Sequence, residues 1–140
     1  MALHDAETDE LVTRLRAQPD VVVAYLFGST ARGTAGPTSD VDVAVLLAPE
    51  PPPLRRLELL AEVAAVVGSE RADLVVLNDA PPAVGYRVVA EGTPLLVRDE
   101  AARVRYTARI VDRYLDLAPV RRELASAQRH RLEEGRFGRR

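Results

Sequence analysis

The stretch LFGSTARGTAGPTSDVDVAVLL, residues 26–47, decides the fold. A hydrophobic run ends in Gly28-Ser29, ten residues rich in small side chains follow, and Asp40 and Asp42 then lead directly into a second hydrophobic run. Side chains on a β-strand alternate between its two faces, so both aspartates point one way and the intervening valines point into the core. The stretch therefore predicts two neighbouring strands whose ends meet around a loop.

The flanking segments extend this pair into an α/β order. Amphipathic periodicity and cap residues predict helices, and β-branched runs predict strands. We expect helices over residues 5–18, 54–67, 82–90, 99–117 and 120–134, with a possible helical turn after Gly28. We expect strands over residues 20–27, 40–47, 71–77 and 93–98. This order predicts an α/β (α+β) domain, a small mixed sheet flanked by helices, over residues 1–118, followed by a basic C-terminal helix and tail over residues 119–140.

Two of these helices carry an apolar stripe that we expect to face the core. The first stripe, in residues 54–67, comprises Leu54, Leu57, Leu60, Ala61, Ala64 and Val67. The second stripe, in residues 99–117, comprises Val104, Ala108, Val111 and Leu115, and Asp99 is the expected N-cap. Tyr106 and Tyr114 of the same helix are expected to pack in the core or against a partner.

Composition sets limits on the class of protein. The 140 residues are 47% hydrophobic and 29% charged, which is typical of a globular domain. The sequence contains no cysteine, no apolar run near the ~20 residues of a membrane helix, and no signal-peptide pattern at its start. We therefore expect a cytoplasmic protein without a membrane partner.

Charge is spread unevenly along the chain. All nineteen basic residues are arginine, so any cationic side chain that contacts phosphate must be an arginine. Residues 121–140 hold seven arginines and three glutamates, which could contact nucleic acid or an acidic partner, although such a tail is more often a solvated helix end. Aromatic residues make up only 4% of the chain, so no stacking surface for nucleic acid is predicted.

The two aspartates of the opening stretch could serve a metal. Two carboxylates on one strand face repel each other unless a cation lies between them. Oxygen ligands suit Mg²⁺, which often also binds substrate phosphates. Taken alone, an Asp-x-Asp is more often an exposed strand edge or a turn than a metal site. The Gly28-Ser29 turn favours the metal, because a glycine backbone can approach phosphate closely and its N–H groups can bind an anion.

The combination resembles a known family. Gly28-Ser29, ten residues and then Asp40-Val41-Asp42 are similar to the signature of the nucleotidyltransferase superfamily related to DNA polymerase β. The triplet Ala31-Arg32-Gly33 and Ser39 before the first acid resemble its minimal nucleotidyltransferase branch. Two later segments, RADLVVLNDAPP and VVAEGTPLLVRDEAARVRYTARIVDRYLD, extend the similarity to roughly residues 20–117.

The resemblance implies roles for individual residues. It implies Asp40, Asp42 and a third acid, Asp73, as catalytic carboxylates and ligands of a two-ion Mg²⁺ site, with Asp79 a weaker candidate for the third. Gly28 and Ser29 would hold the phosphates of ATP. Arg32 would either reach the phosphates or form a local salt bridge. Ser39 would orient Asp40 as a turn residue.

The resemblance also implies a biological role. The minimal branch includes antitoxins that transfer AMP from ATP to a tyrosine of a HEPN ribonuclease toxin and silence it. A chain of this size has little room for an acceptor pocket of its own, so a protein partner is expected to present the hydroxyl. Two alternatives stay open: an antitoxin that acts by binding alone, and a nucleotidyltransferase for a small molecule such as an aminoglycoside.

Overall fold

The computed structural model describes residues 5–28 and 40–117. Along the chain these form α1 (Asp5–Arg16), β1 (Val21–Phe27), β2 (Val41–Leu47), α3 (Arg55–Val67), β3 (Ala72–Val76), a short 3₁₀ turn η1 (Leu77–Asp79), α4 (Pro82–Glu91), β4 (Thr93–Val97) and α5 (Glu100–Asp116). Each of these helices and strands except the 3₁₀ turn was predicted to within two residues. The predicted helix over residues 120–134 and the predicted turn after Gly28 lie outside the described residues. None of the described helices has the length and apolar character needed to cross a membrane.

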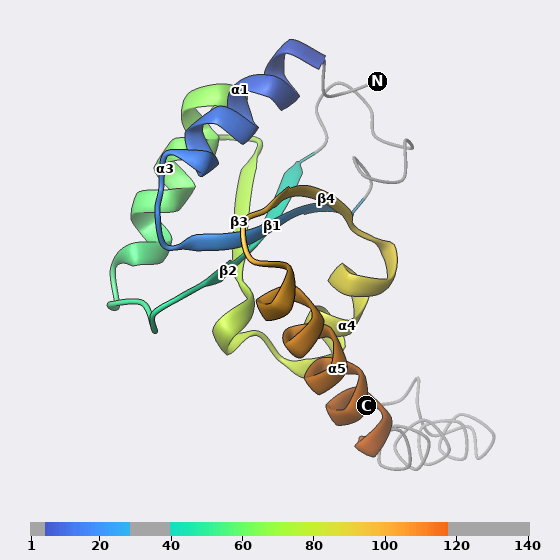
Figure 1. Cartoon of the computed structure of the whole chain (residues 1–140). Coiled ribbons are helices and arrows are strands. Elements are labelled where there is room, and N and C mark those ends of the chain that lie inside the picture. Colours follow the sequence, from blue (N-terminus) through green and yellow to red (C-terminus); the bar gives the residue numbers. More distant parts are fainter. Residues whose placement is uncertain (1–4, 29–39, 118–140) are drawn as a thin grey trace, which may run out of the picture.

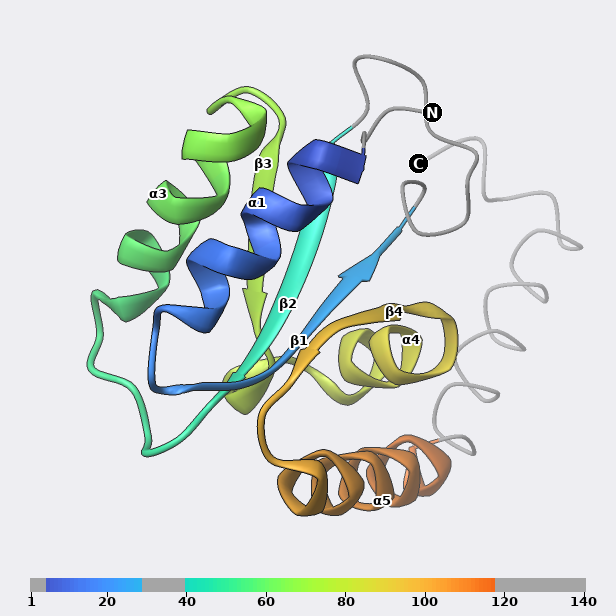
Figure 2. The same cartoon turned by 45° about the horizontal axis from the view of Figure 1, so that its top comes forward.

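A four-stranded mixed sheet in the order β3-β2-β1-β4 organises the fold (Figure 1). β1 pairs antiparallel with both β2 and β4, whereas β2 and β3 run parallel and are joined through α3. Helices α1 and α3 cover one face of the sheet, and α4 and α5 cover the other (Figure 2). The predicted α/β architecture, a small mixed sheet flanked by helices, is confirmed.

Alternation along β2 separates the two layers as predicted. Val41, Val43 and Val45 are fully buried in the core cluster shared with α1 and α3. Ala44 and Leu46 belong to the second cluster, shared with α4 and α5. The side chain of Asp42, two residues before Ala44, therefore lies on the α4 and α5 side at the start of the strand.

The predicted apolar stripe of α3 was largely wrong. Leu54 and Leu57 are 67% and 57% exposed, whereas Leu59 and Val63 are fully buried against the sheet. Val67, at the end of the predicted stripe, is buried as expected. The helix is apolar over more than half of its circumference, so two stripes satisfy the helical period and only the position of the sheet selects between them.

The orientation of α5 is likewise decided by which of two apolar stripes faces the sheet. Tyr106 and Ile110 are buried, whereas Val104 and Leu115 of the predicted stripe are 52% and 60% exposed. The larger side chains face the sheet, where they remove more apolar area from water. Gly85 of α4 makes room for them, since a Cβ there would overlap Tyr106 and Ile110. Two other predictions for this helix are confirmed: Asp99 caps it by accepting from the Ala102 N–H at 3.0 Å, and Tyr106 lies in the core.

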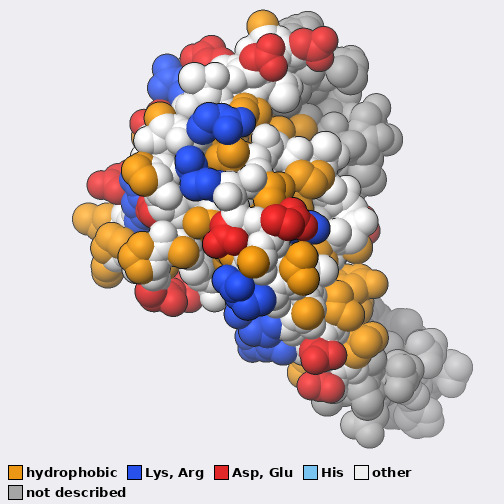
Figure 3. All heavy atoms as spheres, in the orientation of Figure 1, with side chains coloured by type: hydrophobic (Ala, Val, Ile, Leu, Met, Phe, Trp, Pro, Cys, Tyr) orange, Lys and Arg blue, Asp and Glu red, His pale blue; other side chains and the backbone are white. Residues whose placement is uncertain are grey.

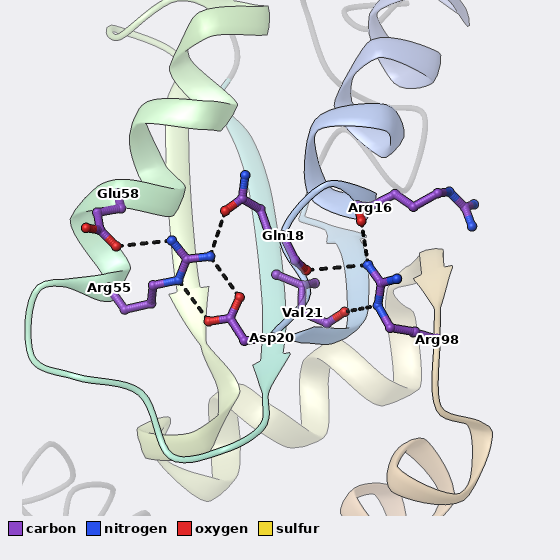
Figure 4. A network of polar contacts seen from close by, with 7 residues as sticks. All are labelled: Arg16, Gln18, Asp20, Val21, Arg55, Glu58 and Arg98. Carbon is purple, nitrogen blue, oxygen red and sulfur yellow. Dashed lines mark hydrogen bonds and ion pairs between the residues drawn. The ribbon is translucent and has the colours of Figure 1, made fainter.

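Two arginines from distant elements hold the connection between α1 and β1 (Figure 4). The guanidinium of Arg55 donates to both carboxylate oxygens of Asp20 at 2.8 Å and to Gln18 Oε1 at 2.7 Å. Arg98, which follows β4, donates to the backbone carbonyl oxygens of Arg16 and Val21 at 2.6 and 3.0 Å. These contacts attach the α1–β1 connection to α3 on one side and to the end of β4 on the other.

The Asp20–Arg55 pair predicts a pH-dependent contribution to stability. Hydrogen bonding from Arg55 lowers the pKa of Asp20 below its ordinary value of 3.8. The stabilisation is therefore fully present above pH 3.8 and is lost as pH falls through the lower, folded-state pKa. We expect Asp20→Asn to lower the free energy of unfolding at pH 7 by about 1.5–3 kcal/mol, as measured by urea titration.

Glu58→Gln is the matched control, because Glu58 contacts the same guanidinium from a side chain that is 64% exposed. Its expected cost is under about 1 kcal/mol. A cost for Asp20→Asn that persists well below pH 3.8 would contradict the interpretation.

Candidate active site

Two aspartates meet where the parallel strands β2 and β3 begin. The register of this pair places Asp42 directly beside Asp73. Both residues occupy the second position of their strand, and parallel strands begin at the same edge of the sheet. The topology therefore brings together two carboxylates that are separated by 31 residues in the chain.

The electrostatics at Asp42 are unfavourable for a charged carboxylate. Burial raises the pKa of Asp42, and the neighbouring carboxyl groups of Asp73 and Asp40 raise it further, including through a hydrogen bond with Asp73. The charge of Arg87, on α4, acts in the opposite direction. A divalent cation between these carboxylates would remove the repulsion, which is the condition expected of a metal–phosphate site.

The backbone of Gly28 lies directly against the carboxylate of Asp42. Gly28 has a φ of +79°, which favours glycine, and a Cβ at this position would overlap Asp42 Oδ2. Any group held by the backbone at the end of β1 is therefore adjacent to Asp42. The end of β1 at Gly28 thus meets the start of β2 at Asp42.

Asp73 is held by contacts along the outer edge of the sheet. Its Oδ1 accepts from the Leu74 backbone N–H at 2.9 Å and lies 3.6 Å from Arg56 Nη2. Arg56, on α3, also donates from Nε to the Leu74 carbonyl oxygen at 3.0 Å. Arg56 thus contacts both the backbone of the edge strand and the carboxylate of Asp73.

A hollow of about 420 Å³ extends from Asp73 along the outer edge of β3. Three prolines that follow β2, residues 51–53, form an apolar wall, and Arg56 lies between this wall and the strand. Asp79, the weaker candidate for the third acid, lines the same hollow farther along. Asp73, not Asp79, is the acid placed beside Asp42.

Of the remaining predicted site residues, the structure describes one, Asp40. Asp40 is exposed, lies immediately before β2 and acts on Asp42 through its charge. Ser29, Arg32 and Ser39 fall outside the described residues. Within residues 5–28 and 40–117, no three acidic or histidine side chains are grouped closely enough to hold a metal ion. The described site is thus a pair of carboxylates with Asp40 at its margin.

Two arginines near the site were not identified from the sequence. Arg56 and Arg87 belong to helices whose charged residues follow no motif, and only the tertiary fold brings them toward Asp73 and Asp42. The absence of lysine already indicated that any basic contact with phosphate would come from arginine, but not which one.

Comparison with known proteins agrees with this geometry. The family described as "Polymerase beta, Nucleotidyltransferase" matches residues 9–101. A curated relative, the protein adenylyltransferase MntA of Shewanella oneidensis, is 38% identical over 77 residues, which cover 55% of this chain. The chain spans about half the length of this relative, since the same alignment covers 55% of it.

Solved structures share the fold over most of the chain. A crystal structure of a toxin–antitoxin with AMP-PNP matches with a TM-score of 0.74 and 28% identity, covering 86% of this chain and 96% of the other. A chain in the complex of tri-AMPylated Shewanella oneidensis HEPN toxin with MNT antitoxin matches with a TM-score of 0.70 and 25% identity, covering 87% and 95%.

The repulsion at Asp42 predicts that this residue opposes folding when no metal is bound. In EDTA at pH 7, we expect Asp42→Asn to raise the free energy of unfolding, because the neutral amide removes a charge that burial and two neighbouring carboxylates disfavour. Urea titration measures the change. Asp79→Asn, at an exposed acid, should change stability by less than about 0.5 kcal/mol. A destabilised Asp42→Asn variant would show that the carboxylates do not repel each other as described.

Proposed function

This chain belongs to the polymerase β nucleotidyltransferase family, and on that basis we propose that it is an antitoxin that transfers AMP from ATP to a hydroxyl, specifically that of a tyrosine, on a partner HEPN ribonuclease toxin. The observation that carries the proposal is the pairing of Asp42 with Asp73 beside Gly28. The similarity to a protein adenylyltransferase and to chains in toxin–antitoxin complexes supports the donor, the acceptor and the partner. The absence of cysteine fits a cytoplasmic location.

The carboxylates fit a Mg²⁺ site in chemistry and in charge. Asp40, Asp42 and Asp73 supply the oxygen ligands that Mg²⁺ prefers, and the mutual repulsion at Asp42 is the electrostatic reason for a cation there. When bound, two Mg²⁺ ions would neutralise the triphosphate and lower the pKa of the acceptor hydroxyl.

The residues of this chain divide the reaction between them. Backbone N–H groups at Gly28 and the hydroxyl of Ser29 hold the outer phosphates of ATP, and Arg32 and Ser39 belong to the same loop. The acceptor oxygen attacks the α-phosphorus, a new P–O bond forms, and the bond to pyrophosphate breaks. Asp73 lies on the side from which the acceptor approaches and takes the proton of the hydroxyl. The contribution of the protein is positioning and charge neutralisation.

The hollow beside Asp73 suits the acceptor side chain. Its proline wall offers apolar surface to an aromatic ring, and Asp73 lies at one end, where a phenolic hydroxyl would arrive. Arg56, fixed to the Leu74 carbonyl, would hold Asp73 in position and contact the acceptor segment. The acceptor would therefore enter along the outer edge of β3, between α3 and the prolines.

The direct test of the function is transfer of label to the partner. Incubation with α-labelled ATP, Mg²⁺ and the HEPN protein encoded beside this chain should label that protein, and its ribonuclease activity should fall as label accumulates. Asp40→Ala with Asp42→Ala should reduce the transfer rate by at least about 10³-fold, because the metal and the phosphates lose their ligands.

Two outcomes would contradict the proposal. If the doubly substituted protein neutralises the toxin at equal dose, the antitoxin acts by binding alone. If ATP labels an aminoglycoside and leaves the HEPN protein unlabelled, the chain is a small-molecule nucleotidyltransferase.

The proposed role of Arg56 predicts that its loss impairs the reaction with the acceptor protein and spares the binding of the nucleotide. We expect Arg56→Ala to lower kcat/KM for the acceptor protein about tenfold, the effect of losing one charge-assisted hydrogen bond, while the affinity for AMP-PNP changes little. Arg16→Ala is the control for charge, since the Arg16 side chain is exposed and points away from the network in Figure 4. An equal loss of AMP-PNP affinity in Arg56→Ala would place Arg56 at the nucleotide and not at the acceptor.

A further inference from the structure

A second cavity, of about 440 Å³, lies at the opposite end of the strands from the carboxylate pair. One wall is formed where β1 begins and β2 ends, and the other wall is the flank of α5. Arg105, Arg109 and Arg113 line the cavity from that flank. They are spaced by four residues, so their side chains follow one another along the helix at intervals of about 6 Å. Figure 3 shows basic side chains gathered along this side of α5.

Asp112 and Asp116 lie within four residues of these arginines on α5 but form no ion pair with them in the described part of the chain. Over the stretches that the structure covers, no ion pair engages Arg105, Arg109 or Arg113, whereas Arg14 and Arg103 each contact a glutamate. Glu50 is the one acid among the described residues that line the cavity. Like charges four residues apart on a helix oppose folding by about 0.2–0.5 kcal/mol per pair, so this arrangement is more favourable with an anion between the arginines.

Arg109 is already held in place. Its guanidinium carbon lies 5.4 Å from the centre of the Tyr106 ring, and that ring is buried between α5 and the sheet. A cation held over an aromatic face retains its charge and keeps N–H groups free to donate. The middle arginine of the row therefore lies against the wall of the cavity with its N–H groups available to a ligand.

We propose that this cavity binds a small phosphate-bearing anion, such as a mononucleotide or pyrophosphate, independently of metal and of the carboxylate site. The volume falls within the ~300–1,000 Å³ typical of small-molecule sites. The planar guanidinium group pairs with phosphate oxygens through two parallel hydrogen bonds, which makes a row of arginines a phosphate site by chemistry.

A long nucleic acid fits this surface less well than a small anion. Asp112 and Asp116 are exposed on α5, and each follows an arginine of the row by three residues, which places it beside the row on the helix surface. They would repel a polyanion that extended beyond the cavity. Tyr106, the aromatic residue in the cavity wall, is 3% exposed and offers no face on which a base could stack.

The test is an NMR titration of the full ¹⁵N-labelled chain in EDTA, first with inorganic pyrophosphate and then with AMP. Removing divalent metal leaves the Asp42 and Asp73 site negatively charged, so it does not attract free phosphate. We expect saturable shifts of the side-chain Nε–H signals of Arg105 and Arg109 and of the backbone signals of Leu47 and Ala102, both in the cavity wall. The stronger of the two titrations identifies whether pyrophosphate or the mononucleotide is preferred.

Three variants separate binding from folding and from net charge. Arg109→Ala should weaken binding about tenfold or more, equivalent to about 1.4 kcal/mol. Arg105→Ala should also weaken it, and this variant leaves the contact between Arg109 and the buried ring of Tyr106 intact. Arg14→Ala changes the net charge equally on α1, where Arg14 contacts Glu10 and Glu62, and should leave binding unchanged.

Several results would overturn the proposal. These are the absence of saturable shifts, shifts confined to Gly28 and Asp42, or equal weakening in Arg14→Ala. Binding of a twelve-nucleotide RNA, on the order of a single-strand site, without binding of either small phosphate would instead make the arginine row a nucleic-acid surface.

Discussion

The parallel register of β2 and β3 is the constraint on which the rest of the site depends. It places a partly buried carboxylate, that of Asp42, directly beside the exposed carboxylate of Asp73. No arrangement within the described chain neutralises this pair fully, since Arg87 offsets the repulsion only in part and Arg56 contacts Asp73 from the outer edge. A carboxyl group whose pKa is raised in this way by burial and by neighbouring carboxylates is typical of functional sites. The mutual repulsion at Asp42 is the observation on which the proposed metal–phosphate site rests.

The surrounding fold holds this arrangement from both sides. β1 lies at the centre of the sheet, between β2 and β4, and its end at Gly28 approaches Asp42 so closely that only glycine fits. At the other end of β1, Asp20 and Val21 are bound by arginines from α3 and from the residue after β4. The strand is thus fixed where it enters the sheet, which keeps its far end in register with the acidic strand starts. Two groups of unlike role, structural arginines and repelling carboxylates, therefore lie at opposite ends of the same strands.

Much of this could be predicted from the sequence, and the failures have physical reasons. Alternation along residues 40–47 correctly placed Asp42 opposite the valines, and the resemblance indicated Asp73 on the next strand. The buried faces of α3 and α5 were mispredicted because each helix carries two apolar stripes, and a helical period cannot tell which one meets the sheet. The roles of Arg56 and of the arginine row of α5 depend on their positions beside strands that are distant in the chain, which the sequence does not reveal. The loop residues that the motif emphasises, Ser29, Arg32 and Ser39, remain predictions.

The most direct measurement of the central claim is paramagnetic broadening by Mn²⁺, used in place of Mg²⁺, in the presence of AMP-PNP. The account predicts that substoichiometric Mn²⁺ broadens the amide signals of Gly28, Asp42 and Asp73 before any others. Asp42→Asn should abolish this selective broadening, while a variant with Asp79→Asn should retain it. Broadening that centres on the exposed acids of α1, or that is unchanged in Asp42→Asn, would contradict the account, because the paired strand ends would then not be the metal site.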